Sequence, residues 1–147
     1  MSNDEMLAMY KAISENPGEL VKAAARKRLI NFSRYMQPDM ILEPFHVVYY
    51  TLLDMFAHGQ IRKMIVQQPP QSEGSSRKLP AFMEGLNPDL KIVIGSYAAT
   101  IARDFNRDVQ RIIDTPRYRE LFPDTYLNGS NVVTMANTYL RNSDVIE

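Results

Sequence analysis

The chain contains no cysteine and no tryptophan, and only two of its 147 residues are histidines. The lack of cysteine excludes disulfide bonds and thiolate metal sites, and with only two histidines beside it argues against a zinc site. Lys+Arg and Asp+Glu both number 17, so any contact with DNA must come from a local basic patch. No apolar run is long enough to span a membrane, and the first residues, MSNDEMLAMYK, carry acids where a signal peptide needs bases. These absences favour a protein of the cytoplasm.

A chain of this length forms about one domain and can bury a core. Hydrophobic residues make up 45% and charged residues 23%, which is an ordinary globular balance. The first sixty residues are predicted to be helical, with helices over 3–13, 19–35 and 44–58. Pro44 opens the third helix and Gly59 ends it. A basic cluster on the second helix is interpreted as a solvated face, with a phosphate-contacting patch as the alternative: Lys22, Arg26, Lys27 and Arg28.

After residue 60, short apolar runs alternate with helical patterns. We predict strands over 62–68, 91–96 and 130–136, and helices over 75–85 and 97–115, with Pro80 kinking or splitting the first of these helices. Such alternation predicts an α/β fold, in which a parallel sheet has helices on its faces. Residues 1–60 then form an N-terminal helical segment, and residues 61–147 form the first part of an α/β domain.

The segment QQPPQSEGSSRKLPAF, residues 67–82, lies where an open α/β sheet would bind a phosphate, between a predicted strand and a helix N-terminus. A P-loop, G-x-x-x-x-G-K-[ST], uses glycines for close backbone approach, a lysine for the outer phosphates and a hydroxyl for magnesium. If Gly74-Ser75-Ser76 is aligned with Gly-Lys-Ser, serine replaces the lysine and Pro69 replaces the first glycine, which is a poor match.

An ordered series of short motifs extends through and beyond this segment. The motifs are Glu43-Pro44-Phe45-His46, Gly59-Gln60-Ile61-Arg62-Lys63, Pro69-Pro70-Gln71, Ser72-Glu73, Ser76-Arg77-Lys78, Pro80-Ala81-Phe82, Gly85-Leu86-Asn87-Pro88-Asp89, Ser96-Tyr97, Asp104-Phe105-Asn106-Arg107-Asp108-Val109 and Tyr118-Arg119-Glu120-Leu121-Phe122-Pro123. Together the motifs resemble the N-terminal ATPase region of tailed-phage terminase large subunits, the motors that package viral DNA. The resemblance covers most of residues 20–145, and its register is unbroken from Ser72 to Pro123.

The resemblance implies a P-loop NTPase-like parallel sheet, and a chain that is the front part of a larger protein. It implies ATP and magnesium as cofactors, and double-stranded DNA, a portal protein and a small terminase subunit as partners, in the bacterial cytoplasm during phage assembly. The nucleotide-binding residues would be those of a degenerate phosphate loop: Pro69, Pro70, Gln71, Ser72 and Glu73. Ser72 takes the magnesium-ligand position. Weaker candidates are His46, which the resemblance places near the base, and Tyr97 at the end of a predicted strand.

Between Gln71 and Ser72 the family has three further residues, His-Gly-Lys. Either the protein lacks them or the printed sequence omits them. A true deletion removes the lysine cation and a permissive glycine, and it shortens the loop, so we expect phosphate binding to fail. Arg77 and Lys78 are not expected to replace the lysine, because they lie one to two turns into the following helix. The acidic pair that hydrolysis needs after an apolar strand is not found either, so the chain is expected to be inactive alone.

Two other functions remain open. The chain could be a non-catalytic interaction or regulatory module derived from a P-loop fold, or a nucleotide-binding protein of another P-loop family, although the ordered motifs argue against the latter. Neither histidine requires a ligand, since His46 can pack on a helix and His58 can stabilise a helix C-terminus. If the sheet continued beyond residue 147, its open edge would promote association, so a homo-oligomer is also expected.

Overall fold

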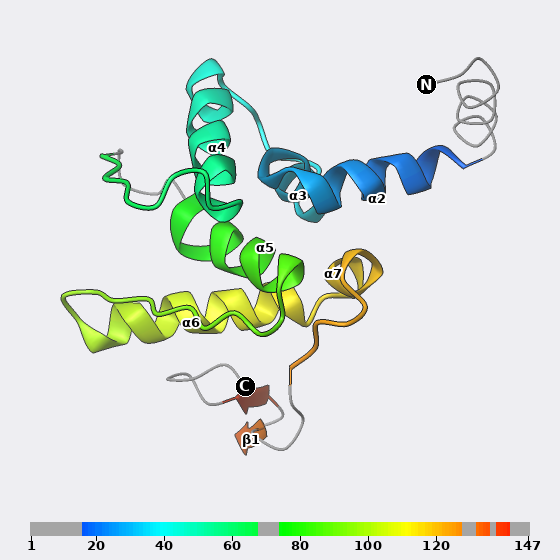
Figure 1. Cartoon of the computed structure of the whole chain (residues 1–147). Helices are drawn as coiled ribbons and strands as arrows, with labels where there is room; N and C mark the ends of the chain where they lie inside the picture. Colours follow the sequence, from blue (N-terminus) through cyan, green and yellow to red (C-terminus); the bar gives the residue numbers. More distant parts are fainter. Residues whose placement is uncertain (1–15, 68–73, 128–131, 136–137, 142–147) are drawn as a thin grey trace, which may run out of the picture.

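The computed structural model describes residues 16–67, 74–127, 132–135 and 138–141, so the helix predicted over 3–13 lies outside the described residues. Figure 1 shows a set of short helices that pack across one another. In chain order the elements are α2 (Pro17–Lys27), α3 (Leu29–Met36), α4 (Pro44–Ala57), the π-helix η1 (Gly74–Lys78), α5 (Leu79–Leu86), α6 (Ala99–Ile113), α7 (Pro116–Leu121), β1 (Val132–Met135) and β2 (Thr138–Arg141).

The single helix predicted over 19–35 is two helices, and that prediction was wrong at one residue. Arg28 has an extended backbone, with φ −135° and ψ 128°, and it separates α2 from α3. The side chain of Arg28 pairs with Asp54 at 3.0 Å, and the next N–H, of Leu29, donates to the same carboxylate at 2.8 Å. Because a distant residue supplies these contacts, helical periodicity within 19–35 does not reveal the break.

Other helix boundaries follow the predicted signals. Pro44 occupies the first turn of α4, and Gly59 follows its end with a left-handed φ of 72°, which glycine adopts without strain. Pro80 lies in the first turn of α5, directly after η1. The helical chain continues from η1 into α5 without a break, so the predicted helix over 75–85 changes from π-helical to α-helical geometry next to Pro80 and is not split there.

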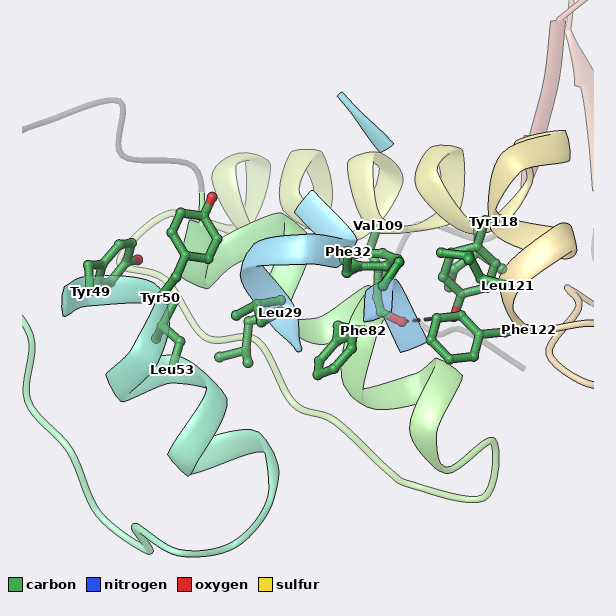
Figure 2. Packing of buried hydrophobic residues seen from close by; sticks show 14 residues of the cluster. Leu29, Phe32, Tyr49, Tyr50, Leu53, Phe82, Val109, Tyr118, Leu121 and Phe122 are labelled. Atoms are coloured by element: carbon green, nitrogen blue, oxygen red, sulfur yellow. Dashed lines mark hydrogen bonds between the residues drawn. The ribbon is translucent and has the colours of Figure 1, made fainter. Parts of the chain in front are cut away.

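The core gathers around Phe32 of α3 (Figure 2). Its ring lies 5.4 Å from that of Phe82 in α5, and 6.1 Å from the rings of both Tyr118 and Phe122, measured between centroids. Such tilted and edge-on arrangements are favourable for aromatic pairs. Leu29, Leu53 and further buried side chains of α4, α6 and α7 complete the cluster. Helices from both sides of residue 60 therefore share one hydrophobic core.

The predicted parallel sheet is not found in the described residues, which are mostly helical, and the α/β prediction was wrong. Residues 61–67 and 90–96 are irregular, with Ile65 and Val93 exposed by 95% and 93%. A strand needs a neighbour for its N–H and C=O groups and cover for its apolar face, and the described chain gives neither segment such a neighbour. The sheet that is described pairs β1 with β2 antiparallel, with Val132 opposite Arg141.

Candidate functional site

The predicted phosphate loop cannot be placed in the structure. Pro69, Pro70, Gln71, Ser72 and Glu73, including the proposed magnesium ligand, all lie outside the described residues. What is described lies on either side of that segment, as an irregular chain up to Gln67 and the π-helix from Gly74 onward. Gly74 packs so closely against Tyr49 that an added Cβ would lie 2.8 Å from its ring. The C-terminal flank of the predicted loop is thus held tightly on α4.

The two weaker candidates, His46 and Tyr97, have no common site. His46 accepts a 2.9 Å hydrogen bond at Nδ1 from the backbone N–H of Glu43, so it closes the first turn of α4. Its ring also lies 3.9 Å from that of Phe45. Tyr97 is 94% exposed in a bend that precedes α6. The structure therefore gives His46 a helix-capping role and leaves Tyr97 on the surface.

The two basic residues that follow the predicted loop, Arg77 and Lys78, are engaged in packing contacts. Arg77 Nε pairs with Asp108 of α6 at 2.8 Å. Lys78 is buried, and its Nζ donates to Gln37 Oε1 at 3.0 Å. These contacts join η1 to α6 and to the turn after α3. That neither cation replaces the P-loop lysine stays a prediction.

The basic cluster of residues 22–28, predicted to be a solvated face, makes contacts with other helices. Arg26 Nε donates to the carbonyl of Leu121 at 2.8 Å, and Lys22 pairs with Glu120 at 3.0 Å. Both contacts attach α2 to α7. The hydrogen bonds from Lys22 and Tyr35 hold the pKa of the Glu120 carboxyl below its usual value. Three cations of the cluster, counting Arg28 with Asp54, are thus paired within the molecule.

A cleft of about 1290 Å³ opens beside α5 and α6, and it is a candidate site. The irregular segment 88–94 forms one wall, and residues 124–127 form another. Pro80 and Val109 contribute apolar lining, while Glu84 and Arg103 bring opposite charges to it. The lining thus combines apolar side chains with several charged ones, and ligands bind in concave sites that offer both.

Glu84 is the chemically distinctive group of this cleft. Its burial raises the carboxyl pKa from 4.5 to about 7. Burial, and to a smaller extent the charge of Glu84, raises the pKa of the Tyr118 hydroxyl. A carboxyl with such a pKa can hold or release a proton near neutrality, and when ionised it can pair with a cationic group. Sequence analysis missed Glu84, and the available signal was one acid within the apolar helix LPAFMEGL.

Within the described residues, no group of three or more His, Cys, Asp or Glu side chains comes together that could hold a metal ion. None of the described helices has both the length and the apolar character needed to cross a membrane.

Several of the sequence motifs contact one another in space. The Tyr118 hydroxyl donates to the carbonyl of Ala81 at 2.8 Å, which links Tyr118-Arg-Glu-Leu-Phe-Pro to Pro-Ala-Phe. Gly85 packs against the ring of Phe122 so closely that a Cβ added to Gly85 would lie 2.4 Å from that ring. These residues therefore serve mainly to build the core. Comparison with known proteins adds no relative, because no protein-family model, no curated protein and no solved structure matches the chain.

Proposed function

We propose that this chain is the front part of a phage terminase large subunit, the ATP-driven motor that packages viral DNA. The complete motor would use ATP and magnesium, and would work with double-stranded DNA, a portal protein and a small terminase subunit. With the sequence as printed, this part holds no P-loop lysine and does not hydrolyse ATP by itself. Its role is then to provide the helical frame on which the phosphate loop and the segments after it are built.

The observation that carries the proposal is the hydrogen bond from Tyr118 to the carbonyl of Ala81. It joins two motifs that lie 37 residues apart, and both belong to the ordered series that resembles the family. Asp108 and Arg77, which pair at 2.8 Å, join two further motifs of the series. Residues that a packing unit requires in fixed positions are also the ones that a family would share. The contacts thus support reading the motifs as one set.

The proposal is tested first by the intact mass of the protein and then by restoring the loop. A mass equal to that of the printed chain means that His-Gly-Lys is truly missing between Gln71 and Ser72. We then insert His-Gly-Lys at that point and measure binding of Mg-ATP by calorimetry. The matched control inserts His-Gly-Ala, which restores loop length without the cation. We expect binding by the lysine insertion and none by the original chain.

Two outcomes would refute this reading of the loop. One is an insertion variant that keeps the helical circular dichroism of the original chain but binds no Mg-ATP. The other is equal affinity of the lysine and alanine insertions, because the lysine should supply most of the charge that meets the phosphates. A mass larger by one His, one Gly and one Lys would mean that the phosphate loop is complete, and the alanine replacement of that lysine becomes the test.

A second candidate function, a non-catalytic interaction module, is favoured by a different observation. Helix α4 leaves large apolar side chains exposed, among them Phe45 and Val48. Clustered exposed apolar groups mark interaction surfaces on soluble proteins. Stable folding of the chain with no nucleotide binding after the insertion would support this candidate over the first.

A further inference from the structure

Helix α4 has apolar side chains on the face directed away from the core as well as on the buried one. Phe45, Val48, Leu52 and Met55 follow one another at spacings of three, four and three, which places them along one side of the helix. Phe45, Val48 and Leu52 are exposed by 52%, 63% and 38%, and Met55 is partly buried. We call these four residues the outer stripe. Spacing of this kind is that of helices that pair with other helices.

The outer stripe is free of charge, while the two ends of α4 carry opposite charges. The one acidic or basic side chain in α4, apart from histidine, is Asp54, which is buried in the core. Before the helix, Asp39 and Glu43 are exposed. After it, Arg62 and Lys63 are exposed. The surface along α4 therefore runs from an acidic end, across an apolar stripe, to a basic end.

We propose that the outer stripe binds the outer stripe of a second copy of this chain, with the two α4 helices antiparallel. A two-fold axis then places the acidic end of each helix opposite the basic end of its partner. It also opposes the two helix dipoles, whereas parallel pairing would bring like charges together. In the antiparallel register centred on the stripe, position 48 of one copy faces position 52 of the other.

The size of the surface predicts how tight this dimer is. Helix α4 has 14 residues and is about 21 Å long, and the outer stripe, from Phe45 to Met55, covers about 15 Å of it. Such a stripe covers less than the roughly 800 Å² that each partner buries in an interface of standard size. The exposed Ile65, just after the basic end, can add to it. The dimer should therefore be weak and dependent on concentration. This inference does not depend on the packaging role, and it needs no sheet edge.

The test measures the molar mass of the full chain by sedimentation velocity over a concentration series. We expect the original chain to shift from monomer to dimer as concentration rises. Val48→Glu buries a carboxylate against the partner's Leu52, so we expect the dissociation constant to rise at least ~10-fold. Leu52→Lys alone should do the same. Val21→Glu on α2, where Val21 is 55% exposed, is the matched control and should leave the dimer intact.

The double variant Val48→Glu/Leu52→Lys separates antiparallel from parallel pairing. In the antiparallel dimer each introduced carboxylate faces an introduced ammonium of the partner, so we expect dimerisation to return. In a parallel dimer each introduced charge faces its own copy, and dimerisation stays lost. The proposal is overturned if the original chain is monomeric throughout the series, if Val21→Glu weakens association as much as Val48→Glu, or if the double variant stays monomeric. Circular dichroism confirms that each variant keeps its helices.

Discussion

The backbone N–H of Leu29 donates a 2.8 Å hydrogen bond to Oδ1 of Asp54, which lies on another helix. The second carboxylate oxygen, Oδ2, pairs with Arg28 Nε at 3.0 Å. Leu29 is the first residue of α3, so Asp54 satisfies one of the N–H groups that a helix start leaves open. Its negative charge is also favourable at a helix N-terminus. One buried carboxylate thus fixes the break between α2 and α3 and attaches it to α4.

Replacing Asp54 should therefore destabilise the fold clearly. For Asp54→Ala we expect the free energy of unfolding to fall by about 2–3 kcal/mol, because a buried N–H loses its acceptor and α3 loses its cap. Asp54→Asn keeps an acceptor and should cost less. Urea denaturation followed by circular dichroism measures both. Asp104→Ala is the control, since Asp104 forms an exposed ion pair worth less than about 1 kcal/mol. Equal effects of Asp54→Ala and Asp104→Ala would contradict the cap.

Local signals in the sequence predicted much of the helical structure. Pro44 and Gly59 marked the ends of α4, and Pro80 marked the change from η1 to α5, because proline and glycine act through their own backbone. The break at Arg28 was missed because Asp54, distant in sequence, supplies the contacts that hold it. The beginning of α6 at Ala99 was placed two residues too early.

The sheet was predicted wrongly for a related reason. The runs at 62–68 and 91–96 have the composition of buried strands, but composition does not state whether a neighbouring strand exists. Ile65 and Val93 are almost fully exposed, so the described chain does not bury what the pattern suggested. The cleft beside Glu84 could not be predicted from the sequence either, because it depends on how α5, α6 and the segment 88–94 pack together.

Gly85 tests the contact between α5 and Phe122. In an open helix, alanine in place of glycine would add about 1 kcal/mol of stability. Here the new Cβ would meet the Phe122 ring at 2.4 Å, so we expect overpacking to outweigh that gain and net stability to fall by about 1–2 kcal/mol. Thermal denaturation of Gly85→Ala is compared with Gly95→Ala, whose Cβ would meet nothing within 4 Å. A more stable Gly85→Ala would show that Phe122 moves aside freely.

The hydrogen bond from Tyr118 to Ala81 gives a third prediction. Tyr118→Phe removes the buried hydroxyl and leaves the Ala81 carbonyl without this donor, which should cost about 1–2 kcal/mol of stability. The aromatic packing against Phe32 is retained, so the variant should still fold. Tyr126→Phe is the control, because Tyr126 is exposed and the loss of its hydroxyl leaves no buried group without a hydrogen-bond partner. If chemical denaturation gives the same midpoint for both variants, the Tyr118 bond contributes nothing to stability.

Glu84 predicts how stability depends on pH. The pKa of Glu84 is about 7 in the folded chain, and in the unfolded chain it has the ordinary value of 4.5. Between pH 4.5 and about 7 the folded state therefore binds more protons than the unfolded state. The contribution of Glu84 to the free energy of unfolding therefore has its full value below about pH 4.5 and is lost as pH rises through about 7. Because Glu84 is only partly buried, we expect this loss to be about 1–2 kcal/mol.

The charged groups that share the cleft with Glu84 are Asp89, Lys91, Arg103 and Asp124. These groups are present in both the original chain and Glu84→Gln, so their contributions to the pH dependence of stability cancel when the two are compared. Glu120 does not interfere, because its lowered pKa places its titration below about pH 5. We expect urea midpoints of the original chain to fall between about pH 5 and about pH 8, and those of Glu84→Gln to fall by less. Asp104→Asn, on the exposed surface, should keep the original slope. If Glu84→Gln also keeps it, the carboxyl of Glu84 is not desolvated by the cleft.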